Sequence, residues 1–89
     1  MQGTASVKVP DGKLVRASIT YDETVEDVTI TGDFFLEPPE AREELEEALE
    51  GLEAEVPREE VLERLEHVDA RLIGFSRENV ADTVMEVIQ

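Results

Sequence analysis

Few residues of this chain are of the types that carry out catalysis, and the only imidazole is the first to consider. His67 lies late in a segment with helical spacing, among Glu63, Glu66 and Asp69. A nucleophilic hydroxyl or thiol needs a base held beside it, and a single histidine cannot by itself form a histidine-based metal site. The chain contains no cysteine, so it has neither a thiolate nucleophile nor ligands for a metal cluster. We expect His67 to be a surface residue near the end of a helix.

Motifs for phosphate binding and for acid–base catalysis are equally sparse. Neither GxGxxG nor GxxxxGK[ST] occurs, so no Gly-rich phosphate loop is predicted. The 23 acidic residues form so many carboxylate pairs that no single pair stands out as a catalytic acid and base. The glutamates of residues 37–55 are spread around a predicted helix, which is typical of a solvated face and not of a metal site. We therefore expect a chain with no catalytic or metal site of its own.

The charge of the chain excludes several classes of partner. Its 89 residues carry 23 acidic and 8 basic side chains, a net charge of −15, and such a surface repels nucleic-acid phosphates and anionic membranes. No apolar run approaches the ~20 residues that cross a bilayer. Residues 1–10 also lack the basic-then-apolar order of a secretory signal. We expect a cytoplasmic protein that binds neither nucleic acid nor membranes.

The acid excess also suggests a salt-adapted protein. Lys8 and Lys13 are the only lysines, and aromatic residues are few. In molar salt the Debye length falls to about 3 Å, so dispersed carboxylates stop repelling one another but still hydrate the surface. This composition is typical of a halophilic protein. The hypothesis predicts that added KCl promotes folding, which circular dichroism can measure.

The elements that position these side chains begin with strands, because the first third of the chain alternates with period two. Apolar residues share one parity in each of three runs, which are Ala5, Val7 and Val9; Val15, Ala17, Ile19 and Tyr21; and Val28, Ile30 and Phe34. Asp11-Gly12 and Asp22-Glu23 separate the runs at positions suited to turns. Pro38-Pro39 ends the region, because proline cannot donate to a strand ladder. The pattern predicts an antiparallel meander of three strands over about residues 4–36.

Beyond Pro38-Pro39 the apolar spacing becomes that of helices. Three stripes occur, which are Ala41, Leu45, Ala48, Leu49 and Leu52; Val61, Leu62, Leu65 and Val68; and Val80, Val84, Val87 and Ile88. Gly51 is placed to end the first helix, Pro57 to open the second, and Ser76 to cap the third. We expect three helices over about residues 39–89, packed on one face of the sheet in a single α+β domain, residues 1–89.

The charge is distributed unevenly, and this indicates a surface for a partner. Residues 1–20 have a balance of +2, whereas residues 21–89 have a balance of −17. Strand alternation places Lys8, Leu14 and Arg16 on the face opposite Val15, and we expect Phe35 to join this face. An apolar centre with a polar rim is typical of an interface. The residues predicted to bind a partner are Lys8, Lys13, Leu14, Arg16 and Phe35.

The Phe34-Phe35 pair allows two arrangements. In an extended segment adjacent residues point to opposite sides, so only one ring would enter the core. Alternatively, the chain bends at Gly32-Asp33 and both rings lie under the first helix. The sequence leaves this choice open.

Two segments of the chain resemble a known family. Residues 8–15 (KVPDGKLV) and 30–38 (ITGDFFLEP) resemble the accessory, or C-terminal, domain of lipoate protein ligases, and the resemblance covers about residues 7–51. Between residues 53 and 73 only a helix pattern is evident, and Gly74-Phe75-Ser76 with Glu78 is similar to the loop that opens the last helix of the family. Asp11 is a departure, because the family often has a second glycine there.

The resemblance implies a two-component ligase in which this chain is the accessory subunit of a heterodimer. A separate catalytic subunit would use ATP and Mg²⁺ to adenylate lipoate and would pass it to a lysine of a lipoyl domain, which this chain would contact only indirectly. The accessory domain is implicated in the adenylation step and would bind no cofactor itself. Within the motif, Gly12 and Gly32 would shape the backbone, and Asp33 would position the turn beside Phe34.

Two other classes of protein are alternatives. A free-standing acidic protein-binding or inhibitory module would bind through its Glu-rich helices, so charge reversal at Glu43 and Glu47 would damage it. The ligase interpretation predicts no effect of those changes. A relative of iron–sulfur scaffold domains would have a similar small fold, but the absence of cysteine removes the cluster ligands.

Overall fold

A meander of strands forms the first part of the molecule. The computed structural model describes residues 1–9, 13–32 and 35–88. In these ranges β1 (Gln2–Lys8), β2 (Leu14–Tyr21) and β3 (Val25–Gly32) form an antiparallel sheet in the order β1-β2-β3, which we call the large sheet. Ala5 pairs with Ala17, and Ala17 pairs with Ile30, so the apolar residues of one parity lie in rows across one face. The alternation therefore predicted both the strands and their apolar face.

The helices follow the predicted stripes. They are α1 (Ala41–Leu49), α2 (Arg58–Glu66) and α3 (Arg77–Ile88). Gly51 follows α1 with a φ of +87°, which glycine adopts without the steric cost of a Cβ atom, and this confirms it as the stop. Pro57 is the N-cap residue of α2, as predicted. No helix in the described ranges is both long and apolar enough to cross a bilayer.

A reciprocal cap opens α3. The Ser76 hydroxyl accepts a hydrogen bond from the Asn79 N–H at 3.1 Å, and the Asn79 side-chain oxygen accepts one from the Ser76 N–H at 2.8 Å. Both N–H groups lie at the helix start, where no helical carbonyl is available to them. The prediction of Ser76 as the cap is confirmed.

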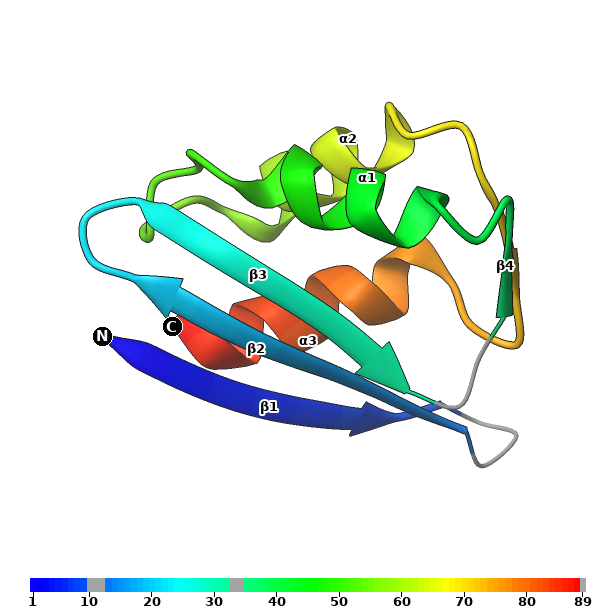
Figure 1. Cartoon of the computed structure of the whole chain (residues 1–89). Helices are drawn as coiled ribbons and strands as arrows, with labels where there is room; N and C mark the ends of the chain where they lie inside the picture. The colour runs from blue at the N-terminus through cyan, green and yellow to red at the C-terminus, as the bar shows by residue number, and fades with distance from the viewer. Residues whose placement is uncertain (10–12, 33–34, 89) are drawn as a thin grey trace.

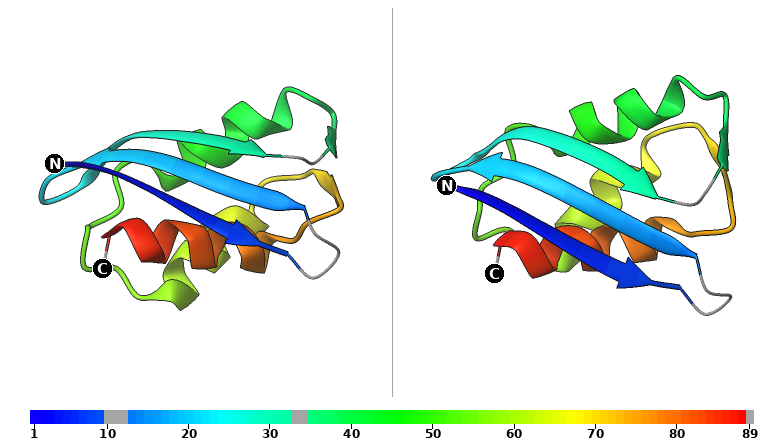
Figure 2. Two further views of the ribbon diagram at one scale, coloured as in Figure 1. Left: turned by 90° about the horizontal axis from the view of Figure 1, so that it is seen from below. Right: turned by 60° about the horizontal axis from the view of Figure 1, so that its bottom comes forward.

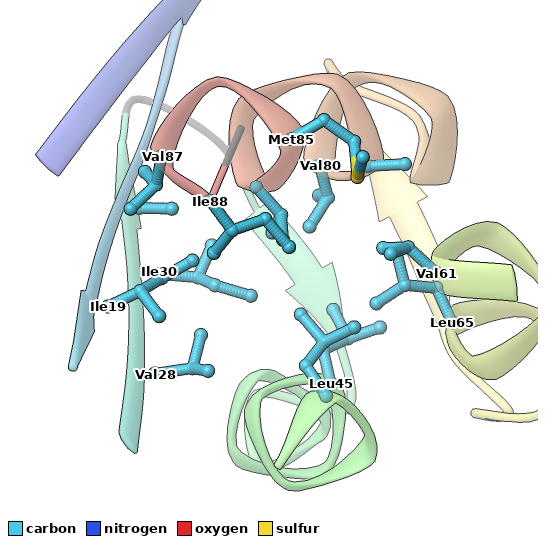
Figure 3. Packing of buried hydrophobic residues seen from close by; sticks show 14 of the residues in the cluster. Ile19, Val28, Ile30, Leu45, Val61, Leu65, Val80, Met85, Val87 and Ile88 are labelled. Atoms are coloured by element: carbon cyan, nitrogen blue, oxygen red, sulfur yellow. The ribbon is translucent and has the colours of Figure 1, made fainter. Parts of the chain in front are cut away.

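The core lies between the large sheet and the helices, which all lie on the same side of that sheet (Figure 1). α3 packs against β1 and β2, α1 packs against β3, and α2 contacts both of these helices. Figure 3 shows Ile19 and Ile30 on the sheet side and Leu45 and Leu65 on the helices around one cluster of side chains. All four are 0% exposed. The α+β fold class, a meander followed by helices on one face, is confirmed.

A second sheet was not predicted. β4 (Phe35–Glu37) and β5 (Arg71–Ile73) pair antiparallel, and we call this pair the ribbon. The expectation of a meander that continues to residue 36 was wrong, because β3 ends at Gly32 and Phe35 begins a strand of the other sheet. The helix pattern assigned to residues 53–73 was also wrong for β5. Strands of three residues are too short to show a period, and their pairing joins segments far apart in the sequence.

The N-terminus and the end of α3 lie near each other, at the end of the molecule opposite the ribbon (Figures 1 and 2). The Tyr21 hydroxyl donates a hydrogen bond to the Val87 carbonyl at 3.3 Å. A Cβ atom placed on Gly3 would lie only 2.9 Å from Cγ1 of Val87. Glycine at position 3 therefore allows β1 to lie directly against the last turn of α3.

Candidate partner-binding surface

The ribbon presents apolar side chains on the face that points away from the core. Phe35 and Ile73 are partners in the ribbon and are 71% and 39% exposed. Their neighbours Leu36 and Leu72 are also partners, but these two pack against the core. Among the described residues, Phe35, Ile73 and Met1 are the large apolar side chains that are exposed. Two such side chains side by side on an acidic protein form a candidate centre for an interface.

Lys13 lies beside the ribbon, because its aliphatic stem covers Gly74. Gly74 directly follows β5 and has a φ of +90°, a conformation that residues with a Cβ atom rarely adopt. A Cβ atom there would lie 2.9 Å from Cδ of Lys13 and 3.1 Å from Cε. The stem thus packs on backbone while the ammonium group is able to stay in water. The contact places a positive charge next to the strand that carries Ile73.

The other predicted residues of the first hairpin lie on the open face of the large sheet. Lys8 and Arg16 are exposed, and Leu14, the register partner of Lys8, is half-buried. The Arg16 Nε group donates a hydrogen bond to the Ser6 hydroxyl at 3.2 Å, across the two strands. Because Val15 is fully buried on the opposite face, the predicted parity of these side chains is confirmed.

Phe35 does not share that face with Lys8 and Arg16, contrary to the sequence prediction. It lies in the ribbon, so parity counted along a continuous strand does not apply to it. The alternative, in which both rings lie under the first helix, is also wrong for Phe35, because that ring is largely exposed. Gly32 ends β3 opposite Val15. The remaining motif residues, Gly12, Asp33 and Phe34, fall outside the described residues.

A groove runs beside Phe35, between the ribbon and the start of α1. Its lining includes Phe35, Leu36, Pro39, Glu40, Arg42 and Glu43. The first three give it an apolar part that continues the exposed face of the ribbon. Arg42 lies between acidic neighbours, so this rim is mixed in charge. Glu43 therefore belongs to the candidate surface. A charge reversal at Glu43 cannot serve as a control for changes elsewhere on the molecule.

Ile73 is the residue that sequence reasoning missed. A signal was present, because Leu72 and Ile73 are adjacent and apolar and are followed by Gly74. Two apolar neighbours in an extended segment cannot both face one core, which is the argument already applied to Phe34 and Phe35. The contact of Lys13 with Gly74 has no comparable local signal.

The described side chains were also searched for chemistry. His67 is exposed at the C-terminal end of α2, and its Nδ1 atom lies 2.7 Å from the Glu63 carbonyl oxygen, which confirms it as a surface residue near a helix end. Within residues 1–9, 13–32 and 35–88, no group of three or more His, Asp or Glu side chains is placed to hold a metal ion.

The described residues form a small α+β domain with a candidate contact surface on its ribbon. The fold is similar to that of a solved chain from Thermoplasma acidophilum, with a TM-score of 0.77, 21% sequence identity and coverage of 94% of each chain. That chain comes from an archaeal lipoylation system, described as a bi-partite lipoate protein ligase and its E2 lipoyl domain. No protein-family model matches the sequence, and no curated protein matches it significantly. At this level of identity the likeness establishes the fold.

Proposed function

We propose that the chain is the small, non-catalytic component of a two-part lipoate protein ligase. It docks on a separate catalytic subunit and supports the ATP-dependent adenylation of lipoate that precedes transfer to a lipoyl-domain lysine. The observation that carries the proposal is the likeness, over 94% of both chains, to a chain of a bi-partite lipoate ligase system. Because the two covered shares are equal, the matched chain is about as long as this one. The motifs in residues 8–15 and 30–38 point to the same family.

The same lipoylation system also contains a lipoyl domain, which accepts lipoate on a lysine. The alternative to our proposal is therefore that this chain is the acceptor. An acceptor lysine has to extend its Nζ atom into the active site of the ligase. This chain offers Lys8, within β1, and Lys13, whose stem is held over Gly74. Intact mass spectrometry after a complete lipoylation reaction tests the choice, because the proposal predicts that the mass of this chain stays unchanged.

Docking explains how a chain without catalytic groups can support adenylation. The reaction joins two anions, the lipoate carboxylate and the ATP phosphate, and it depends on holding them in line while excluding water. A rigid domain that covers loops of the active site supplies order of this kind. In our proposal Phe35 and Leu14 provide apolar contacts, and Lys8, Lys13 and Arg16 contact acidic groups of the catalytic subunit. The motif roles predicted for Gly12, Gly32, Asp33 and Phe34 stay part of the proposal, and of these four residues only Gly32 lies within the described ranges.

The direct test is reconstitution in concentrated KCl. The catalytic subunit is mixed with ATP, Mg²⁺ and lipoate, and formation of lipoyl-AMP is followed with and without this chain. We expect adenylate to accumulate much faster when the chain is present. The proposal is wrong if the catalytic subunit forms adenylate equally well alone, or if the isolated chain turns over lipoate by itself.

A pair of charge reversals separates this function from an acidic inhibitory module. Lys13→Glu changes the charge beside the ribbon, whereas Glu47→Lys makes the opposite change on the exposed side of α1, one helical turn beyond the groove residue Glu43. Docking through the ribbon predicts that Lys13→Glu slows adenylation and that Glu47→Lys has little effect. An acidic module that binds through its helices predicts the reverse in a binding titration.

A further inference from the structure

The two outer strands of the large sheet differ in how their free edges are covered, and β3 is the protected one. The Ile30 N–H donates a hydrogen bond to a carboxylate oxygen of Glu46 in α1 at 2.7 Å. The Val25 N–H donates to the Leu52 carbonyl at 2.7 Å, and the Val25 carbonyl accepts from the Gly51 N–H at 2.8 Å. Three outward backbone groups of β3, at both ends of the strand, are thus occupied by the chain itself. Coverage of this kind prevents another strand from pairing there.

The edge of β1 is open. Tyr21 donates its N–H to the Met1 carbonyl, and Val9 donates its N–H to the Lys13 carbonyl, so the odd-numbered residues of β1 exchange hydrogen bonds with β2. The even-numbered residues direct their N–H and C=O groups away from β2, and these are Gln2, Thr4, Ser6 and Lys8. No hydrogen bond from residues 1–9, 13–32 or 35–88 reaches those outward backbone groups. Figure 2 shows β1 as the outer strand on the side of the sheet away from α1.

The core is also incompletely covered beneath β1. Ala5 and Val7 face the core side, yet both are only half-buried. Their partners in β2, Ala17 and Val15, are 1% and 0% exposed. Burial therefore falls off toward the β1 edge, where no further strand shields the apolar side chains. A strand added there would cover Ala5 and Val7 while pairing the outward backbone groups.

The charge around this edge favours one kind of occupant. β1 contains no acidic residue, and Lys8 and Arg16 stand on its outer face or next to it. A second copy of the chain would bring another net charge of −15 alongside, which like-charge repulsion opposes. A strand with an acidic side chain opposite Lys8 is attracted instead, and Arg16, one strand further in, adds to the positive charge near it. The Lys8 end of β1 is also close in the chain to Lys13, which contacts Gly74 after β5, so positive charge continues from this edge toward the ribbon.

We infer that the β1 edge is a strand-addition site that takes an acidic edge strand of the catalytic subunit and extends the large sheet by one strand. The inference rests on the proposed function and deepens it, because it specifies how the two chains join. Backbone hydrogen bonds to Gln2, Thr4, Ser6 and Lys8 provide affinity, burial of Ala5 and Val7 adds to it, and Lys8 with Arg16 selects the charge of the incoming strand.

Hydrogen exchange of single amides tests this directly, because strand addition has an alternating pattern. In the free ¹⁵N-labelled chain, the amides of Thr4, Ser6 and Lys8 exchange rapidly, whereas those of Ala5 and Val7 are already protected by β2. On binding the catalytic subunit, the three outward amides become protected by about 100-fold or more, as expected for newly formed ladder hydrogen bonds. If they exchange at the same rate in the complex as in the free chain, the inference is wrong.

Two variants at Ser6, compared with each other, isolate the effect of removing one backbone N–H donor. Ser6→Pro deletes an N–H that β2 does not use, and the extended backbone on both sides suits proline. Ser6→Ala keeps the N–H, but like the proline variant it loses the hydroxyl that Arg16 contacts. We expect Ser6→Pro to raise the Kd for the catalytic subunit about tenfold above that of Ser6→Ala. Equal Kd values for two folded variants would contradict strand addition.

The outcomes also separate this inference from the proposed function. A stable complex that supports adenylation while leaving the outward amides unprotected would overturn strand addition and leave the ligase role intact. Failure to form any complex with the catalytic subunit would overturn both. Protection of Thr4 and Ser6 in the chain alone, increasing with its concentration, would identify a second copy as the occupant and would overturn the assignment to the catalytic subunit.

Discussion

The large sheet and the ribbon follow the same alternation of side chains, but their outward faces differ. In the large sheet Ala17 and Ile30 face the helices, and the outward face carries hydroxyl side chains such as Thr29. In the ribbon Leu36 faces the core, but the outward face carries Phe35 and its partner Ile73. An outward face of hydroxyl groups is compatible with water, whereas an outward face of large apolar groups is not stabilised by it. The difference makes the outward face of the ribbon the more apolar of the two, and therefore the candidate contact face.

The largest expected effect concerns the core that the large sheet forms with the helices. Leu45→Ala removes a side chain that is 0% exposed between α1 and the large sheet, and the cavity should lower the free energy of unfolding by about 3 kcal/mol. Urea unfolding at fixed KCl concentration measures it. Leu62→Ala, at a half-buried position of α2, is the control and should cost clearly less. A loss below about 1 kcal/mol for Leu45→Ala would mean that the core is not packed as described.

Arg77 connects the core to the ribbon, and its removal should have the next largest effect. Its guanidinium donates hydrogen bonds to the carbonyls of Leu65 at 3.1 Å, Val68 at 2.7 Å and Ala70 at 3.0 Å, just before β5 begins. Arg77→Ala removes all three of these hydrogen bonds, although the Leu65 carbonyl keeps the one from the Val68 N–H at 3.1 Å, and it should lower the free energy of unfolding by about 2 kcal/mol. Faster amide exchange in β5 should accompany the loss. Unchanged exchange there would show that Arg77 does not hold the ribbon.

Phe35→Ala sharpens the comparison, because it should separate binding from folding. The exposed ring contributes little to the folded chain, so the urea midpoint should stay nearly unchanged. Loss of its contact area should weaken binding to the catalytic subunit by about 1.5 kcal/mol, roughly tenfold in Kd. Isothermal titration of the catalytic subunit with the wild-type chain and with the Phe35→Ala variant measures the two Kd values. A variant that binds normally, or one that unfolds much more easily, would show that the ribbon does not have the role assigned to it.

Ser76→Ala should have the smallest effect of the four. The substitution removes the hydroxyl that accepts the Asn79 N–H at the start of α3, which should cost about 1 kcal/mol of unfolding free energy. Ser76→Asp keeps an acceptor at the same position and should restore most of the stability. Binding through Phe35 should be equal in the two variants. If Ser76→Ala weakened binding more than folding, α3 would have to be counted as part of the interface.

Local patterns in the sequence predicted most of the fold but only part of the candidate surface. Alternation and helical stripes need only neighbouring residues, so the meander, the helices and the positions of Gly51 and Ser76 were all accessible. The ribbon was not, because β4 and β5 are stable only when paired with each other, and their partnership spans α1 and α2. The exposure of Ile73 depends on that pairing. Lys8 and Arg16 were placed on the correct face because strand parity is local.

The position of the chain ends has a practical consequence for experiments that tether the molecule. A linker joined before Met1 leaves beside Gln2, at the start of the open β1 edge, whereas a linker joined after α3 leaves from behind the large sheet. Both attachment points lie at the opposite end from β4, the strand that begins at Phe35 (Figure 1). Surface capture through the C-terminal side should therefore leave both docking surfaces accessible. Capture through the N-terminal side should hinder strand addition and spare the ribbon, so the orientation of an immobilised chain itself becomes a probe of which surface binds.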